Sequence, residues 1–292
     1  MQKLLIHITL CLLPFVAGAQ TTTLQVVTKT VQKTVSWKPG YELEINGEKA
    51  EVEVTPGSAN NIVVRAELSA RHPRLDTAIM DVEGWKFVVS TIGKKIYVRA
   101  YIGLPSGKRL PTSNLKAKIV IEAPAACPVN LANKFGKAHL ERLDAPIALT
   151  GEFCNFTLLQ LKGSVKIDSR YGNVEGSDLQ GKVEVQSKRA DVALSQVHAD
   201  CAVRSEYGKV WVQPDSQTGN LWIQGTKSDV TVDLPQPPQH NVFLTAEYGE
   251  LTAPTSFQQS KPAENTKRAV LNHQQGLPVL TVETNFGSIT IQ

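Results

Sequence analysis

Pairs of an aromatic residue and a glycine recur at nearly constant intervals along the second half of this 292-residue chain. Successive pairs are separated by 36, 36, 41 and 38 residues, and they are Phe135-Gly136, Tyr171-Gly172, Tyr207-Gly208, Tyr248-Gly249 and Phe286-Gly287. Apolar residues stand six and four positions before every aromatic residue, and apolar or small residues stand three and five positions after it. Alternation with a period of two on both sides of a tight turn predicts two short strands that face one core.

A second set of similar segments lies halfway between these pairs, so the repeating unit is about 18 residues long. The position after the aromatic residue is always small, as a tight corner packed against its neighbours requires. The residues at this position are Gly136, Cys154, Gly172, Ala190, Gly208, Ser228, Gly249 and Gly287. The unit is too short for a propeller blade and has no helical signature, so we expect an all-β stack of parallel β-coils, a β-helix.

Stacking such coils at the ~4.8 Å spacing of strands aligns the residues that precede the small ones. These residues are Phe135, Phe153, Tyr171, Arg189, Tyr207, Lys227 and Tyr248. Arg189 and Lys227 then lie between tyrosines, where cation–π contacts are favourable. Ion pairs between neighbouring coils are expected one position earlier, from Glu152, Arg170, Lys188 and Glu206. The aligned strip either binds carbohydrate or protein, or is a spine that fixes the register of the coils, which is the simpler interpretation.

The N-terminus has the pattern of a secretory signal peptide over residues 1–19. Lys3 provides a positive charge, residues 4–16 are apolar, and Ala17-Gly18-Ala19 forms a cleavage site of small residues. The apolar stretch is shorter than the ~20 residues that span a membrane. Cys11 lies within that stretch behind a bulky leucine, which argues against a lipid-attachment cysteine. We therefore expect a secreted bacterial protein of the periplasm or the cell surface, with no transmembrane segment after cleavage.

The rest of the chain divides into two regions. Residues 20–125 contain strand-like runs separated by turn signals, without the 18-residue period, and we expect an antiparallel β region that caps the first coil. Residues 126–292 form the β-helix. Within it, residues 254–278 are rich in Gln, Lys, Asn and Ser and interrupt the repeat. We expect a surface loop and a distal cap there.

The repeats resemble those of the bacterial "putative adhesin" family, secreted domains of unknown function. The resemblance covers about residues 115–292 and rests on four segments, which are residues 167–174, 203–210, 244–251 and 284–289. Each carries an aromatic residue and Gly, followed by alternating apolar positions, and the residue two positions before the aromatic residue is Ser or Thr in three segments and Ala246 in the fourth. The resemblance implies a right-handed parallel β-helix. It implies an adhesive role only by analogy, because the motif specifies architecture and not chemistry.

Composition and motifs exclude several functional classes. The formal net charge of +4 is spread along the chain without a basic block, so nucleic-acid binding has no electrostatic support. None of the six histidines has a partner at the spacing of metal ligands, and no nucleophile elbow or phosphate-binding loop is present. We therefore expect no metal, no cofactor and no catalytic residue. The oligomeric state stays open.

The three cysteines after the leader are an odd number in an oxidising compartment, so at least one thiol is free. Cys201 replaces an apolar residue of the core pattern, which favours a buried, inert thiol. A bridge between Cys127 and Cys154 is the alternative that the sequence leaves open.

Outward-facing aromatic residues are the best candidates for a binding site. The alternation directs Trp211, Trp222 and Phe243 outward, with Trp222 and Phe243 at equivalent positions of successive coils. Such residues stack on sugar rings or anchor partners. We therefore predict a non-catalytic adhesin-like or cell-envelope scaffold that binds surface polysaccharide or an envelope protein. The alternative is a β-helix polysaccharide lyase or hydrolase, in which Asp168 and Glu184 would supply paired carboxylates.

Overall fold

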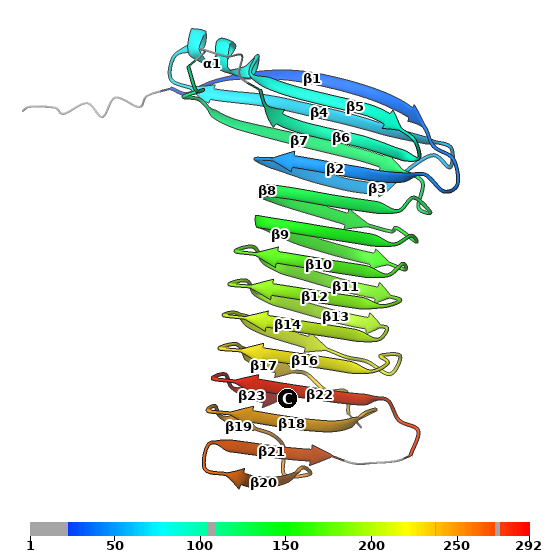
Figure 1. Cartoon of the computed structure of the whole chain (residues 1–292), viewed down its shortest axis with the longest axis vertical. Helices are drawn as coiled ribbons and strands as arrows, with labels where there is room; N and C mark the ends of the chain where they lie inside the picture. The colour runs from blue at the N-terminus through cyan, green and yellow to red at the C-terminus, as the bar shows by residue number, and fades with distance from the viewer. Residues whose placement is uncertain (1–22, 104–108, 237, 272–274) are drawn as a thin grey trace, which may run out of the picture.

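The computed structural model describes residues 23–103, 109–236, 238–271 and 275–292. The predicted signal peptide lies outside these residues. The described chain is a long stack of β-strands with one short helix, α1 (Leu75–Val82), at one end (Figure 1). The prediction of an all-β protein is confirmed.

The strands form two faces that meet across the core. Two long strands, β8 (Val129–Glu141) and β9 (Ile147–Leu161), bend at the corner and run through both faces. Along the stack, the first face is ordered β5 (Trp85–Ile92), β6 (Lys95–Ile102), β2 (Glu42–Glu48), β8, β9, β10 (Val165–Arg170), β12 (Val183–Lys188), β14 (Cys201–Glu206), β16 (Leu221–Thr226), β22 (Val279–Asn285), β18 (Asn241–Glu247), β21 (Thr266–Leu271) and β20 (Gln258–Ala263).

The second face lies behind the first and has its own order. It runs β1 (Gln25–Ser36), β4 (Asn61–His72), β7 (Asn114–Ala123), β3 (Ala50–Pro56), β8, β9, β11 (Val174–Gln180), β13 (Val192–His198), β15 (Lys209–Gln213), β17 (Asp229–Val232), β23 (Ile289–Ile291) and β19 (Leu251–Thr252). Pairing is parallel from β7 through β19, as it is in the first face from β6 through β18.

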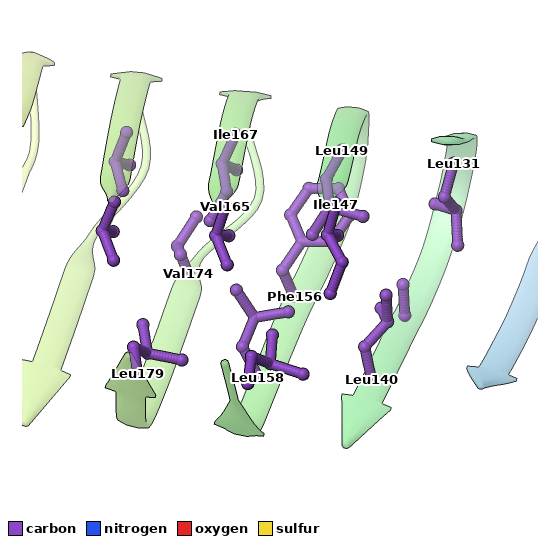
Figure 2. Close-up of a cluster of buried hydrophobic side chains, with 14 of the residues drawn as sticks. Leu131, Leu140, Ile147, Leu149, Phe156, Leu158, Val165, Ile167, Val174 and Leu179 are labelled. Atoms are coloured by element: carbon purple, nitrogen blue, oxygen red, sulfur yellow. The ribbon is translucent and has the colours of Figure 1, made fainter. Parts of the chain in front are cut away.

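The core is built from equivalent residues of successive coils. On the first face Val129, Ile147, Val165, Val183 and Cys201 stand opposite one another, so these coils repeat every 18 residues. All five side chains are buried. Figure 2 shows apolar side chains of the two faces meeting between the ribbons, with Leu131 and Leu149 on one side and Leu140 and Leu158 on the other. The period-two alternation therefore directs one side of every strand into a continuous core.

Each coil turns at a corner where the chain adopts an unusual backbone conformation. The residues before the small positions have φ between +50° and +58°, and we call them the corner column: Phe135, Phe153, Tyr171, Arg189, Tyr207, Lys227, Phe286 and Tyr248. Residues other than glycine rarely adopt this left-handed region. Their side chains stack with those of neighbouring coils. Ring centroids lie 5.1 Å apart between Phe135 and Phe153 and 4.7 Å apart between Phe153 and Tyr171.

The cation–π contacts expected in the corner column are confirmed. The Arg189 guanidinium lies 5.6 Å from the ring centres of both Tyr171 and Tyr207, and Lys227 Nζ lies 5.1 Å from that of Tyr207. Of the ion pairs expected one position earlier, Lys188 bonds Glu206 at 2.9 Å. Glu152 pairs with Lys134 at 3.4 Å, whereas Arg170 lies 3.8 Å from Asp168 on its own strand.

The small residue at each corner is required by close contact with the backbone of the preceding corner. A Cβ atom added at Gly172 would lie 2.2 Å from the carbonyl oxygen of Cys154, and one at Gly208 would lie 2.2 Å from that of Ala190. The same contact limits Gly136, where the distance to the Ala50 oxygen would be 1.9 Å. Glycine is therefore needed at these corners because a Cβ atom has no room there.

Side-chain hydrogen bonds support the corners from outside and inside. On the outside, the backbone N–H of Asn173, Asp191 and Lys209 each donates to a side-chain oxygen of the preceding coil, at 2.8–3.0 Å. On the inside, the Ser169 hydroxyl donates to the Gly172 carbonyl at 2.5 Å, and the Thr284 hydroxyl donates to the Gly287 carbonyl at 2.8 Å. These bonds satisfy backbone groups that the turn removes from the strand ladder.

The β-helix begins earlier than the sequence predicts. Within residues 20–125, β1, β4 and β7 are antiparallel neighbours, as are β5 and β6, but β2 and β3 pair in parallel with β8 and form the first coil. The boundary at residues 125 and 126 is therefore wrong. Lys49 occupies this coil's corner with φ of +50°, followed by Ala50. The aromatic–glycine pattern does not identify this coil, because its corner contains neither an aromatic residue nor glycine.

The order of the last coils also differs from the prediction. The strands β22 and β23 lie between the coil of β16 and β17 and the coil of β18 and β19, although they follow both coils in the sequence (Figure 1). In the corner column, Phe286 accordingly lies between Lys227 and Tyr248, and its ring stacks on Tyr248 with centroids 4.8 Å apart. The residues at 254–278 were expected to be a surface loop and cap. They contain a hairpin, β20 and β21, that extends the first face antiparallel to β18.

We predict that Gly208→Ala lowers the free energy of unfolding by about 2 kcal/mol, because the new Cβ would overlap the Ala190 carbonyl. Ala190→Gly is the matched control, since this corner already accommodates a Cβ, and its cost is about 1 kcal/mol or less. Urea unfolding followed by circular dichroism measures both variants. Equal losses would show that contact with the preceding corner does not select glycine.

Candidate functional site: a polar depression on the first face

A depression lies on the outer surface of the first face, over β10, β12, β14 and β16. Its volume is about 510 Å³. Its lining residues are polar or charged, and they are Asp168, Arg170, Gln186, Ser187, Lys188, Arg204, Ser205, Glu206, Gln224 and Thr226. A second depression of about 310 Å³ continues it toward β22, β18 and β21 and shares Gln224 and Thr226. We call the two together the polar depression.

The strand register explains why these side chains gather. Asp168, Gln186, Arg204 and Gln224 are direct cross-strand partners, and the row continues through Glu283 and Thr245 to Arg268. Because successive coils are ~4.8 Å apart, one outward row of polar residues follows the axis of the stack. A long ligand lying along that axis would meet a new side chain at each coil.

Arg204 is the one cation of the larger depression that forms no ion pair within the described chain. Lys188 bonds Glu206, and Arg170 lies near Asp168. The Arg204 guanidinium instead lies over the Trp222 ring, 4.7 Å from its centre. A stacked guanidinium keeps its N–H groups free at the edge, so Arg204 can donate to hydroxyl or carboxylate oxygens of a ligand.

The three aromatic residues proposed from the sequence do not form one platform. Trp211 lies on the second face, opposite Ala193 and Thr231. Trp222 is half-buried and covered in part by Arg204. Phe243 is 39% exposed, but Thr281 of β22 lies between Phe243 and Trp222, so the prediction that they are on successive coils is wrong.

The corner column is exposed but offers little ring surface for stacking on a ligand. The rings of Phe135, Phe153 and Tyr171 stack face to face, and Tyr171 and Tyr207 contact Arg189. Sugar recognition by aromatic residues uses the ring face. Because neighbouring coils occupy these faces, the column is a structural spine that aligns the coils.

The carboxylates of the enzymatic alternative are held as ordinary surface ions. Asp168 stands opposite Gln186, and Glu184 stands opposite Lys166 in the adjacent row. The Glu184 carboxylate bonds Lys182 at 2.5 Å, and this hydrogen bond lowers its pKa. A general acid needs a raised pKa to hold its proton near neutral pH. The environment of Glu184 favours the ionised form.

The sequence did not reveal one cluster of a histidine and two aspartates, because these residues come together only when the coils stack. On the second face, His198 Nε2 lies 2.6 Å from Asp215 and its Nδ1 lies 3.7 Å from Asp178. These partners are about one coil away in sequence, so no local spacing reveals them. In the part of the chain that the structure describes, no group of three His, Cys, Asp or Glu residues has the arrangement of a metal site.

The cysteine thiols after residue 22 are all free and buried. Burial raises the pKa of Cys127 and of Cys201 to about 12 and that of Cys154 to about 11. The bridge between Cys127 and Cys154 that the sequence left open is absent from the structure. A thiol that stays protonated is a poor nucleophile, which agrees with the inert role expected for Cys201.

The described chain contains no helix long and apolar enough to cross a membrane.

A model of the Toastrack DUF4097 family matches residues 41–292. The match begins where β2 begins, which agrees with a first coil at β2 and β3. No curated protein sequence matches the chain.

Three solved bacterial structures are similar to this chain at low sequence identity. A putative adhesin from Bacteroides fragilis is 14% identical, with 90% of this chain and 97% of that chain covered and a TM-score of 0.45. A putative cell adhesion protein from Clostridium sporogenes is 14% identical, with 90% and 99% covered and a TM-score of 0.28. A putative lipid binding protein from Parabacteroides distasonis is 11% identical, with 91% and 96% covered and a TM-score of 0.39.

We predict that the three thiols do not react with Ellman's reagent in the folded protein at pH 8. Their raised pKa values keep them protonated, and burial blocks the reagent. In 6 M guanidinium chloride, three thiols per chain from Gln20 should react, which absorbance at 412 nm measures. Rapid reaction of one thiol in the folded state would contradict the inert role.

Proposed function

Since this chain belongs to the Toastrack DUF4097 family, we propose that it is a secreted, non-catalytic scaffold of the bacterial cell envelope with an adhesin-like role. Its rigid first face binds glycans or protein partners through the polar depression. The β-coils wind in the right-handed sense that parallel crossovers nearly always adopt. The protein is located in the periplasm or at the cell surface.

The observation that carries the proposal is the free edge of Arg204 within a continuous polar row. Gln186 and Gln224 flank Arg204 on the neighbouring coils and provide both donors and acceptors, which suits sugar hydroxyls. Trp222 holds the guanidinium in place by stacking beneath it. Trp222 is thus a positioning residue, a different role from the sugar platform suggested by its sequence position.

The stiffness of the sheet supports binding by a shallow surface. Each strand of the depression is hydrogen-bonded to a neighbour on both sides, so ligand binding orders little of the backbone. Such preorganisation reduces the entropy lost on binding. A polymer that follows the row would engage several coils at once, and linked contacts of this kind raise the overall affinity.

The lowered pKa of Glu184 and its ion pair with Lys182 support a non-catalytic face. A hydrolase would require two carboxylates with different protonation states across one cleft. The lyase or hydrolase alternative is therefore kept as an outcome of the binding experiment.

We predict that an array of bacterial envelope polysaccharides and glycans contains ligands for the chain from Gln20. Arg204→Ala should weaken binding about tenfold or more, because a charge-assisted hydrogen bond is lost. Trp222→Ala should give a smaller loss, since the guanidinium remains but becomes mobile. Phe243→Ala tests the exposed aromatic residue that the sequence also predicted for binding.

Trp211→Ala is the matched control, because this tryptophan lies on the second face. Isothermal titration with the best ligand of the array compares the four variants. Equal binding by the Arg204→Ala variant and the unchanged protein would contradict the proposed site. Cleavage of a polysaccharide, detected as new reducing ends or unsaturated products, would establish the enzymatic alternative.

A further inference from the structure

Exposed apolar side chains gather at the end of the stack where the described chain begins. Helix α1 lies there, against β1 and β4 (Figure 1). It buries Thr77, Ala78, Asp81 and Val82 and exposes the apolar residues of its opposite side. The exposed large apolar residues of this region, which we call the end patch, are Leu24, Val26, Leu75, Ile79, Met80 and Leu110.

The end patch is a fixed feature of the fold. Ile79 is 49% exposed, Met80 62% and Leu110 73%. The segment that carries Leu110 is fastened to the helix, because the backbone N–H groups of Thr112 and Ser113 donate to Asp81 Oδ2 at 3.0 and 2.8 Å. These two bonds help to lower the pKa of Asp81, so its carboxylate remains ionised and keeps the segment in place.

Two arginines lie beside the end patch. Arg71 is the cross-strand partner of Val26, and Arg109 directly precedes Leu110. Arg71 forms no ion pair within the described residues, whereas Arg74 is paired with Asp76 and Lys29 with Glu83. Arg109 donates to the Thr112 hydroxyl at 3.4 Å, and its charge helps to lower the pKa of Asp81. Apolar side chains bordered by arginines are typical of helices that lie in the interface of an anionic membrane.

The described chain begins beside helix α1. Gln25, the first residue of β1, stands opposite His72, three residues before α1. The sequence predicts that the leader directs export through a membrane and is then removed after Ala19.

We infer that the end patch docks on an anionic lipid surface. Leu75, Ile79, Met80 and Leu110 enter the interface while Arg71 and Arg109 contact lipid phosphates. The stack then projects from the membrane. Six strand spacings separate β1 from β11, through β4, β7, β3, β8 and β9, so the polar depression begins ~30 Å away from the lipid. This inference does not depend on which ligand the depression binds.

Co-sedimentation with vesicles tests the inference. The chain from Gln20 contains every described strand and core residue, and it is mixed with vesicles of phosphatidylcholine alone or with 30% phosphatidylglycerol. We expect binding to the anionic vesicles and release in 0.5 M NaCl. Ile79→Ser with Met80→Ser should lower the partition coefficient about tenfold, because two apolar side chains no longer enter the lipid.

Three further proteins make the result decisive. Arg71→Gln with Arg109→Gln should reduce the preference for anionic vesicles. Val279→Ser, which changes an exposed apolar residue far along the stack and outside the polar depression, should bind as the unchanged protein does. Leu110→Ser repeats the apolar test outside the helix, in case the helix variant unfolds by circular dichroism.

Two outcomes would overturn the inference. One is an absence of binding to anionic vesicles at low salt, or binding that the apolar substitutions leave unchanged. The other is a dimer, measured by light scattering, that Ile79→Ser with Met80→Ser dissociates, because the end patch would then be an interface between two copies. Loss of vesicle binding with retained glycan binding, or the reverse, separates this inference from the proposed function.

Discussion

Contact between the backbones of successive corners is the constraint on which the rest of the structure depends. Gly136, Gly172 and Gly208 each lie so close to the carbonyl of the corner before them that a Cβ atom has no space. This approach brings the residue before each small one into register with its equivalents, so that aromatic rings and cations stack along the edge. The left-handed backbone of the corner column is unfavourable for such residues. Two interactions offset this conformational cost. The side chains of the corner column stack on one another, and side chains of the preceding coil accept hydrogen bonds from the backbone beside the corner.

The same register creates the surface that we propose as functional. Once the core side of each strand is fixed by burial, the other side must face solvent, and equivalent positions form rows at the strand spacing. In most rows, neighbouring charges neutralise one another, as Lys188 and Glu206 do. Arg204 differs because its guanidinium stacks on Trp222 and forms no ion pair within the described residues. The aromatic residues thus divide into two roles, since the corner column aligns the coils and Trp222 positions a cation.

The sequence predicted the features that are contained within one coil. It did not predict which coils are neighbours in the stack, because the coils are similar to one another. The alternating residues around Tyr171 and Tyr207 identified strands, corners and core, because each pattern is contained within one coil. The coil at β2 and β3 was missed because Lys49-Ala50 forms its corner. Trp222 and Phe243 were placed side by side because the sequence gives no sign that β22 inserts between β16 and β18. The contacts of Arg204 with Trp222 and of His198 with Asp215 did not follow from any local pattern, because each joins residues of neighbouring coils.

The sequence by itself determined the all-β class, the length of the coil, the inward and outward side of each strand and the small residue at the corner. These properties depend on the period of side chains along one strand and on the space available at one turn. Only the tertiary structure decided the order of the last coils, the place where the β-helix begins and the neighbours of each outward side chain. The physical reason is that every coil presents the same ladder of backbone donors and acceptors to the next. The choice among equivalent partners is made by the packing of the whole stack.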